Sequence, residues 1–237
     1  MLSKKPIPVR DRLIVALDVS SADEARHLVT TLGDSVNFYK LGLELFMAGG
    51  YFEFLDWLHG LGKKSFVDLK FFDVPNTVAS AVRRLKDRHP VFTTVHGNDE
   101  IMRAACAEKN GMKVLAVTVL TSLDEGDLKD LGFQVSPKQL VLSRARRALQ
   151  IGCDGVVSSG LEVEELRAAL GETFLIVVPG IRPVANVDDQ KRTVDVEDAF
   201  RKGADYIVVG RPIRAASDPK TAAEAVQTRI AKLFAAV

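Results

Sequence analysis

Short apolar runs rich in β-branched residues alternate along the whole chain with longer amphipathic segments. Helical periodicity is clearest at residues 22–32 and 75–87, and glycines stand where such helices would end before the next apolar run. The apolar runs predict eight strands, at residues 12–18, 35–42, 64–70, 91–97, 112–120, 153–159, 173–180 and 205–210. The pattern therefore predicts eight consecutive βα units.

Eight such units in 237 residues match the size of a (β/α)8 TIM barrel. We expect a single α/β barrel domain over residues 1–237, with a short polar N-terminal extension at about 1–11. An open doubly wound sheet is the alternative fold. The first strand ends at Asp18 without the glycine-rich fingerprint of a dinucleotide site, so that alternative loses its usual cofactor.

The charge balance narrows the classes of partner. Lys and Arg number 32 against 31 Asp and Glu, so the chain has no broad basic field for nucleic acid. No apolar run approaches the ~20 residues that span a bilayer, and the first residues lack a signal-peptide core. We expect a cytoplasmic protein without nucleic-acid or membrane partners. Cys106 and Cys153 stand alone, without metal-type spacing, and receive no chemical role.

The segment DLKFFDVPNT at residues 68–77 carries the densest group of charges beside an apolar run. Alternate side chains of a strand share a face, so Asp68 and Lys70 point together while Val67 and Leu69 point to the other side. If the apolar pair packs under helices, the charged pair projects into the barrel, where charge is tolerated only when paired or functional. A structural salt bridge and a poised proton donor both fit this pattern.

Other polar residues also follow predicted strands, which is where barrel enzymes place their chemistry. They are Asp18, Lys40, His96, Thr121 and Ser122. Taken singly, Asp18 or Ser122 could cap the next helix, and His96 could be a structural histidine. Together with the third strand they predict a polar ring at the barrel mouth.

The last two strands predict a phosphate site. PGIRP, with Gly180 and Arg182, follows the seventh strand, and GRPI, with Gly210 and Arg211, follows the eighth. Glycine lets the backbone approach an anion, and arginine offers a bidentate donor. The alternative is that the glycines serve tight turns and the arginines are solvated. The repetition on adjacent strands favours a phosphorylated small molecule as ligand.

With these motifs in order, the chain resembles the bacterial orotidine 5′-phosphate decarboxylases over nearly its whole length. The resemblance rests on ALD at 16–18, YKLG at 39–42, residues 68–77, VHG at 95–97, TVLTS at 118–122, PGIRP at 179–183, DDQKR at 188–192 and VVGRPI at 208–213. One departure is Phe72, which stands where many bacterial members have His, although the acid–base row is intact.

The resemblance implies an activity and a set of roles. Orotidine 5′-phosphate would be decarboxylated to uridine 5′-phosphate in de novo pyrimidine biosynthesis, without cofactor or metal. Lys70 would protonate C6, Asp68 would face the substrate carboxylate, and Lys40 and Asp73 would flank them. The resemblance also implies a homodimer in which Asp73 and Thr77 enter the site of the other subunit.

The remaining implied contacts are to the substrate. Asp18 and Thr77 would lie near the ribose, and Thr121 and Ser122 near the pyrimidine. Gln190 would lie between pyrimidine and phosphate. The other substrate-side positions are Pro179, Arg182, Gly210 and Arg211.

Two other functions share part of this pattern. Metal-dependent sugar-phosphate decarboxylases and aldolases of related barrels also carry Asp-x-Lys-x-x-Asp. They place an acidic metal ligand after the second strand, where this chain has the cation Lys40. A non-catalytic barrel that binds a phosphorylated ligand would need the Gly and Arg elements only, and would gain nothing from a buried charge row.

Overall fold

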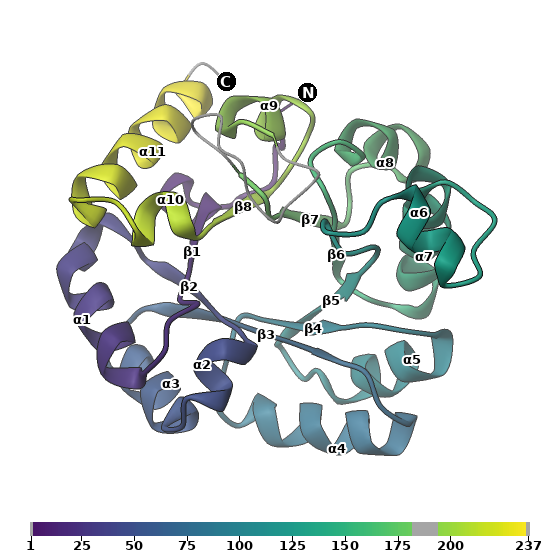
Figure 1. Cartoon of the computed structure of the whole chain (residues 1–237), viewed down its shortest axis with the longest axis horizontal. Helices are drawn as coiled ribbons and strands as arrows, with labels where there is room; N and C mark the ends of the chain where they lie inside the picture. The colour runs from purple at the N-terminus through teal and green to yellow at the C-terminus, as the bar shows by residue number, and fades with distance from the viewer. Residues whose placement is uncertain (1, 182–193, 236–237) are drawn as a thin grey trace.

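The computed structural model describes residues 2–181 and 194–235, and within them a closed parallel barrel forms the centre of the molecule. Its strands follow one another in chain order, and β1 closes the ring by pairing Leu13 with Ile207 of β8 (Figure 1). They are β1 (Leu13–Ala16), β2 (Phe38–Leu41), β3 (Lys64–Phe71), β4 (Phe92–Val95), β5 (Lys113–Val117), β6 (Gly155–Val157), β7 (Leu175–Val178) and β8 (Tyr206–Val209). The predicted barrel and the place of each predicted strand are confirmed.

Helices surround the strands on all sides (Figure 1). They are α1 (Ala22–Leu32), α2 (Leu43–Met47), α3 (Tyr51–Gly60), α4 (Pro75–Lys86), α5 (Asp99–Glu108), α6 (Glu125–Asp130), α7 (Pro137–Ile151), α8 (Val163–Leu170), α9 (Val196–Arg201), α10 (Arg211–Arg214) and α11 (Pro219–Phe234), with 3-10 turns at Val9–Arg12 and Gly33–Ser35. The helix expected at 22–32 is α1 and the one expected at 75–87 is α4. No described helix has the length and apolar character needed to cross a bilayer.

Two separate apolar cores follow from the alternation of side chains along the strands. One fills the barrel, where the ring of Phe92 lies 5.3 Å from that of Phe38 and 5.1 Å from that of Tyr206. The other lies between the strands and the helices and includes Val67. Phe66 belongs to the inner core, so β3 alternates as expected and directs its later charges toward the barrel mouth.

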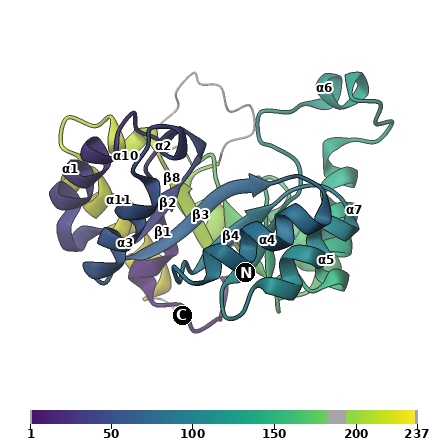
Figure 2. The same ribbon diagram turned by 90° about the horizontal axis from the view of Figure 1, so that it is seen from below.

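Polar contacts organise the base of the barrel. Asp205, fully buried ahead of β8, accepts hydrogen bonds from Ser3 Oγ at 2.5 Å and Lys5 Nζ at 3.1 Å. It also pairs with Arg167 at 2.7 Å. These contacts fix the N-terminal extension to the base of the barrel, while α6 projects beyond the opposite end (Figure 2).

Candidate active site

The end of β3 departs from regular strand geometry at Lys70. Its φ of 48° lies in the left-handed region, which is strained for a residue with a side chain. The pairing with β4 shifts register between Val67 and Phe71, as at a β-bulge. The backbone N–H of Lys70 donates to Thr94 Oγ1 at 2.9 Å. The bulge therefore re-aims the Lys70 side chain, and Thr94 holds the strained backbone in place.

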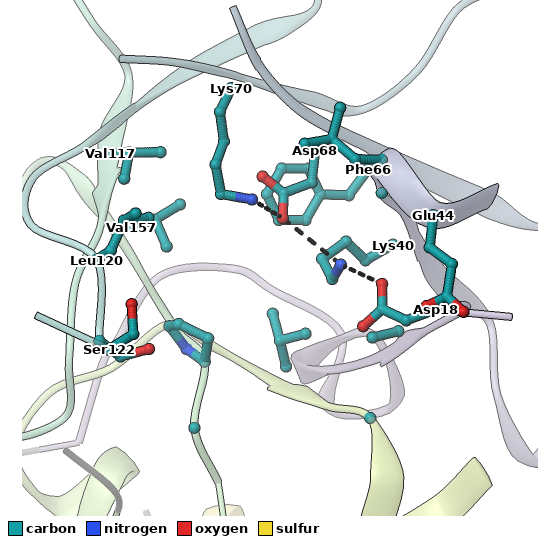
Figure 3. Close-up of a pocket in the computed structure, with 18 of the residues that line it drawn as sticks. Asp18, Lys40, Glu44, Phe66, Asp68, Lys70, Val117, Leu120, Ser122 and Val157 are labelled. Carbon is teal, nitrogen blue, oxygen red and sulfur yellow. Dashed lines mark hydrogen bonds and ion pairs between the residues drawn. The ribbon is translucent and has the colours of Figure 1, made fainter. Parts of the chain in front are cut away.

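Four charged side chains from three strands form a row of alternating sign (Figure 3). Lys70 Nζ lies 3.0 Å from Asp68 Oδ2, which lies 3.5 Å from Lys40 Nζ. Lys40 Nζ in turn donates to Asp18 Oδ1 at 2.9 Å. Thr94 Oγ1 completes the shell of Asp68 by donating to Oδ1 at 2.9 Å. The row is therefore preorganised by ion pairs and hydrogen bonds within one chain.

The electrostatics keep both inner members of the row ionised. Burial raises the pKa of Asp68, but Lys40 and Lys70 outweigh burial, so the pKa lies below the usual carboxyl value. Burial likewise lowers the pKa of Lys40, but Asp68 and Asp18 reverse this and hold the pKa above the usual lysine value. The site therefore presents a fixed Asp68 carboxylate beside the ammonium of Lys40.

This row forms one side of a cavity of about 410 Å³ at the barrel mouth. Val117, Leu120 and Val157 lie across from it (Figure 3). The residues expected at the site that line this cavity are Asp18, Lys40, Asp68, Lys70, Thr121, Ser122, Pro179, Gly210 and Arg211. A flat ring could thus lie between an apolar wall and a charged one, with a phosphate near the glycines and arginine after β7 and β8.

Asp73 and Thr77 are not brought into this cavity. Both are exposed, and Asp73 Oδ1 accepts the N–H of Val74 at 2.6 Å just ahead of α4. Their neighbours are unusual, because Phe72 and Val74 leave 70% and 63% of their surface exposed. Within one chain, the site lacks the second carboxylate expected from residues 68–77.

His96 was predicted either as part of the polar ring or as a structural histidine, and the structure favours the structural role. Its side chain is absent from the cavity lining and packs against Phe72, with ring centroids 5.6 Å apart. Burial, followed by the charges of Arg144 and Lys70, lowers the pKa of His96, so the imidazole is neutral at pH 7. Its Nδ1 is buried without a hydrogen-bond partner among the described residues. His96 therefore supports the loop behind Lys70 and does not face the cavity.

Sequence reasoning missed several of the described residues that line or support the site, among them the following four. Gly42 leaves room for the row, since a Cβ there would lie 3.1 Å from both Asp18 Oδ1 and Lys40 Nζ. Ser158 directly follows β6 and lines the cavity, and its buried Oγ has no partner within the described ranges. Arg214 lines the phosphate end one turn after Arg211. Thr94 is the fourth.

The strand-end rule applied to the sixth strand would have found Ser158, and helical spacing from Arg211 would have found Arg214. Nothing in the sequence marks Thr94, because its contacts depend on the bulge in β3. Arg182 and Gln190 lie outside the described residues.

Known proteins resemble this chain in sequence and in fold. It is 62% identical over 237 residues to an orotidine 5′-phosphate decarboxylase of Methylococcus capsulatus, covering 99% of this chain and 98% of that protein. It is 51% identical over 240 residues to the enzyme of the same name from Stenotrophomonas maltophilia, covering 99% and 100%.

Among solved structures, an orotidine 5′-phosphate decarboxylase from Lactobacillus acidophilus superposes with a TM-score of 0.83 at 36% identity, covering 93% of this chain and 99% of that one. Residues 11–226 also match the sequence model of a family described as orotidine 5′-phosphate decarboxylase / HUMPS. Because the family match, the relatives and the charged barrel mouth agree, the chain belongs to the orotidine 5′-phosphate decarboxylase / HUMPS family.

Proposed function

We propose that this chain decarboxylates orotidine 5′-phosphate to uridine 5′-phosphate, a step of de novo pyrimidine biosynthesis, without cofactor or metal. The observation that carries the proposal is the row Asp18, Lys40, Asp68 and Lys70 on one side of the cavity. The names of the relatives at 51% and 62% identity support the same substrate. The cytoplasmic location stays a prediction from the sequence.

The chemistry requires a proton donor at the carbon that loses CO2. When the C6–carboxylate bond breaks, its electron pair stays on C6 in an sp² orbital that no carbonyl delocalises. An ammonium beside C6 stabilises this charge and then transfers its proton to form the new C–H bond. Lys70 is suited to this because Asp68 lies 3.0 Å from its Nζ. The products are CO2, uridine 5′-phosphate and a neutral lysine, which regains its proton from solvent.

Asp68 has a second effect in the proposed reaction. Its carboxylate is held by Lys40, Lys70 and Thr94, so it cannot turn away from an incoming anion. A substrate carboxylate beside it is repelled, and the repulsion disappears as neutral CO2 forms. The fixed charges of the row also replace water around the reacting carbon.

The phosphate end supplies the binding energy for this arrangement. Gly180, Gly210, Arg211 and Arg214 line the cavity after β7 and β8, whereas Lys70 lies at the end of β3, so the phosphate and the reacting carbon have separate binding regions. Energy from the phosphate contacts can then hold the pyrimidine against the charged row.

We also propose that Asp73 and Thr77 complete the site of a second subunit in a homodimer. Both are exposed and outside their own chain's cavity, and exposed Phe72 and Val74 flank Asp73. Two large apolar side chains beside a polar pair are typical of a surface that another chain covers. A second copy would cover them and bring a carboxylate to the row.

Turnover after chelation tests the proposed function against its metal-dependent rival. Lys40 Nζ lies 2.9 Å from Asp18 and 3.5 Å from Asp68, between the carboxylates that a Mg²⁺ ion would need. We expect the loss of ultraviolet absorbance by orotidine 5′-phosphate to continue at the same rate after exhaustive EDTA treatment. If turnover is lost and Mg²⁺ restores it, the metal-dependent sugar-phosphate decarboxylases and aldolases would be the better assignment. Nucleotide binding without turnover would favour a binding barrel.

A further inference from the structure

The two cysteines of the chain, far apart in sequence, meet on the outside of the barrel. Cys106 lies on α5 and Cys153 follows α7, and their sulfur atoms are 3.6 Å apart. Cys153 is buried, whereas Cys106 is partly exposed. Neither lines the active-site cavity. A small oxidant can therefore reach Cys106 first, and a second sulfur stands directly behind it.

A lysine directly after the same helix holds the two segments together. Lys109 Nζ donates to Gly152 O and to Asp154 Oδ2, both at 2.9 Å, and these residues flank Cys153 in the chain. Lys109 caps the C-terminal end of α5 with helical backbone angles, three residues after Cys106, so the two side chains leave the helix end on the same side. Asp154 Oδ2 also accepts the N–H of Val114 in β5. The packing of α5, β5 and the turn before β6 therefore holds the two sulfur atoms close together.

The surroundings give the two thiols different roles. The hydrogen bond between the two sulfurs lowers the pKa of Cys106, burial and Asp154 act against this, and the nearby ammonium of Lys109 favours the thiolate. The hydrogen bond with Cys106 and burial raise the pKa of Cys153. Because Cys106 is the thiol that solvent reaches and Cys153 is buried behind it, Cys106 is assigned as the nucleophile and Cys153 as the resolving thiol, in line with these pKa directions.

We propose that Cys106 and Cys153 form a peroxide-reactive pair that closes to a reversible disulfide. The Cys106 thiolate attacks one oxygen of a hydroperoxide and breaks the O–O bond, giving a sulfenic acid and releasing hydroxide or alkoxide. The Cys153 sulfur then attacks the sulfenic sulfur, loses its proton, and displaces the oxygen as water. The thiols lose two electrons and the peroxide gains them. A dithiol reductant restores both thiols.

The test uses the intact protein and hydrogen peroxide. Because the chain has only these two cysteines, loss of titratable thiol reports on them alone. Trypsin under non-reducing conditions should release residues 104–109 linked to residues 148–167. Dithiothreitol should separate the two peptides and return both thiols. The same treatment of protein unfolded in urea is the control, and it should give less of the linked pair.

Two variants separate the roles. Cys153→Ala leaves the nucleophile without a resolving sulfur, so dimedone should trap a sulfenic acid at Cys106. Cys106→Ala should leave the buried Cys153 thiol unmodified under the same peroxide exposure. No linked peptide from the folded wild-type protein would overturn the proposal. So would links only between separate chains, or equal labelling of Cys153 in Cys106→Ala. These readouts use thiols and peptide masses, so they stand or fall independently of the decarboxylase assignment.

Discussion

Replacing Thr94 by valine tests whether the shape of the β3 bulge matters for turnover. The substitution keeps the branched shape and removes one hydroxyl, which accepts the Lys70 N–H and donates to Asp68 Oδ1, each at 2.9 Å. Thr94 is fully buried, so bulk water does not take over these contacts. A hydrogen bond to a charged group contributes roughly 1.5–3 kcal/mol, and an unsatisfied buried N–H costs roughly 1–3 kcal/mol.

We therefore expect Thr94→Val to lower the free energy of unfolding by about 2.5–6 kcal/mol in urea titrations. Without its acceptor, the strained backbone of Lys70 at φ 48° relaxes and moves the ammonium. Because about 1.4 kcal/mol corresponds to a factor of ten in rate, kcat should fall by roughly 10- to 100-fold. The assay is the decrease in ultraviolet absorbance of orotidine 5′-phosphate, with kcat and KM determined separately. KM should change less than kcat, since the phosphate contacts are untouched.

The neighbouring residue of the same strand is a matched control. Thr93 is also fully buried, but its Oγ1 has no hydrogen-bond partner among the described residues. Thr93→Val should therefore leave stability and kcat close to those of the wild type, and Thr94→Ser should recover most of the lost kcat by restoring the hydroxyl. Equal effects of the two valine substitutions would refute the positioning role of Thr94.

Three further predictions test other parts of the site. Lys70→Ala and Asp73→Ala should each be impaired alone but recover activity when unfolded and refolded together, because one site of each mixed dimer carries no lesion. A tag on one variant confirms that the subunits have exchanged. If the mixture is then no more active than the average of the two variants, Asp73 does not belong to a shared site. Arg211→Ala should raise KM and lower kcat for orotidine 5′-phosphate. Arg214→Ala should raise KM for orotidine 5′-phosphate by roughly tenfold. It should leave KM unchanged for orotidine, which lacks the phosphate. A parallel change for both substrates would exclude a phosphate contact. Since the pKa of Asp68 is depressed in the folded state, its contribution to stability is complete above the unfolded carboxyl pKa of about 4 and is lost as pH falls through the lower folded value. The difference in unfolding free energy between wild type and Asp68→Asn should therefore shrink below about pH 4. A constant difference down to pH 2 would contradict this linkage between the Asp68 pKa and stability.

The fold and the charged row were predictable from the sequence, because both depend on the short-range pattern of apolar and polar residues. Alternation along β3 is enough to place Asp68 on the inner face with Phe66, and the strand-end rule places Asp18 and Lys40 beside it. The final aim of Lys70 depends also on the bulge. Thr94 was not predictable, since its two contacts arise only when β4 pairs with a bulged β3.

The same limit explains the cysteines and the second carboxylate. Cys106 and Cys153 appear unrelated in sequence, because their contact depends on how α5 packs against the turn before β6. The resemblance assigned Asp73 to the site of a second subunit, and the fold of one chain leaves it exposed outside its own cavity. The short-range pattern of a sequence does not predict how distant elements, or separate chains, pack against each other.

The most direct test of the account compares wild type and Lys70→Ala, both treated with EDTA, on orotidine 5′-phosphate. We expect the wild type to convert the substrate to uridine 5′-phosphate and CO2. Lys70→Ala should lose turnover by a factor of at least about 10², the usual scale of proton transfer by a positioned group. It should still bind uridine 5′-phosphate by calorimetry, because Arg211 and the glycines at the phosphate end are intact. Turnover by Lys70→Ala near the wild-type rate would contradict the account.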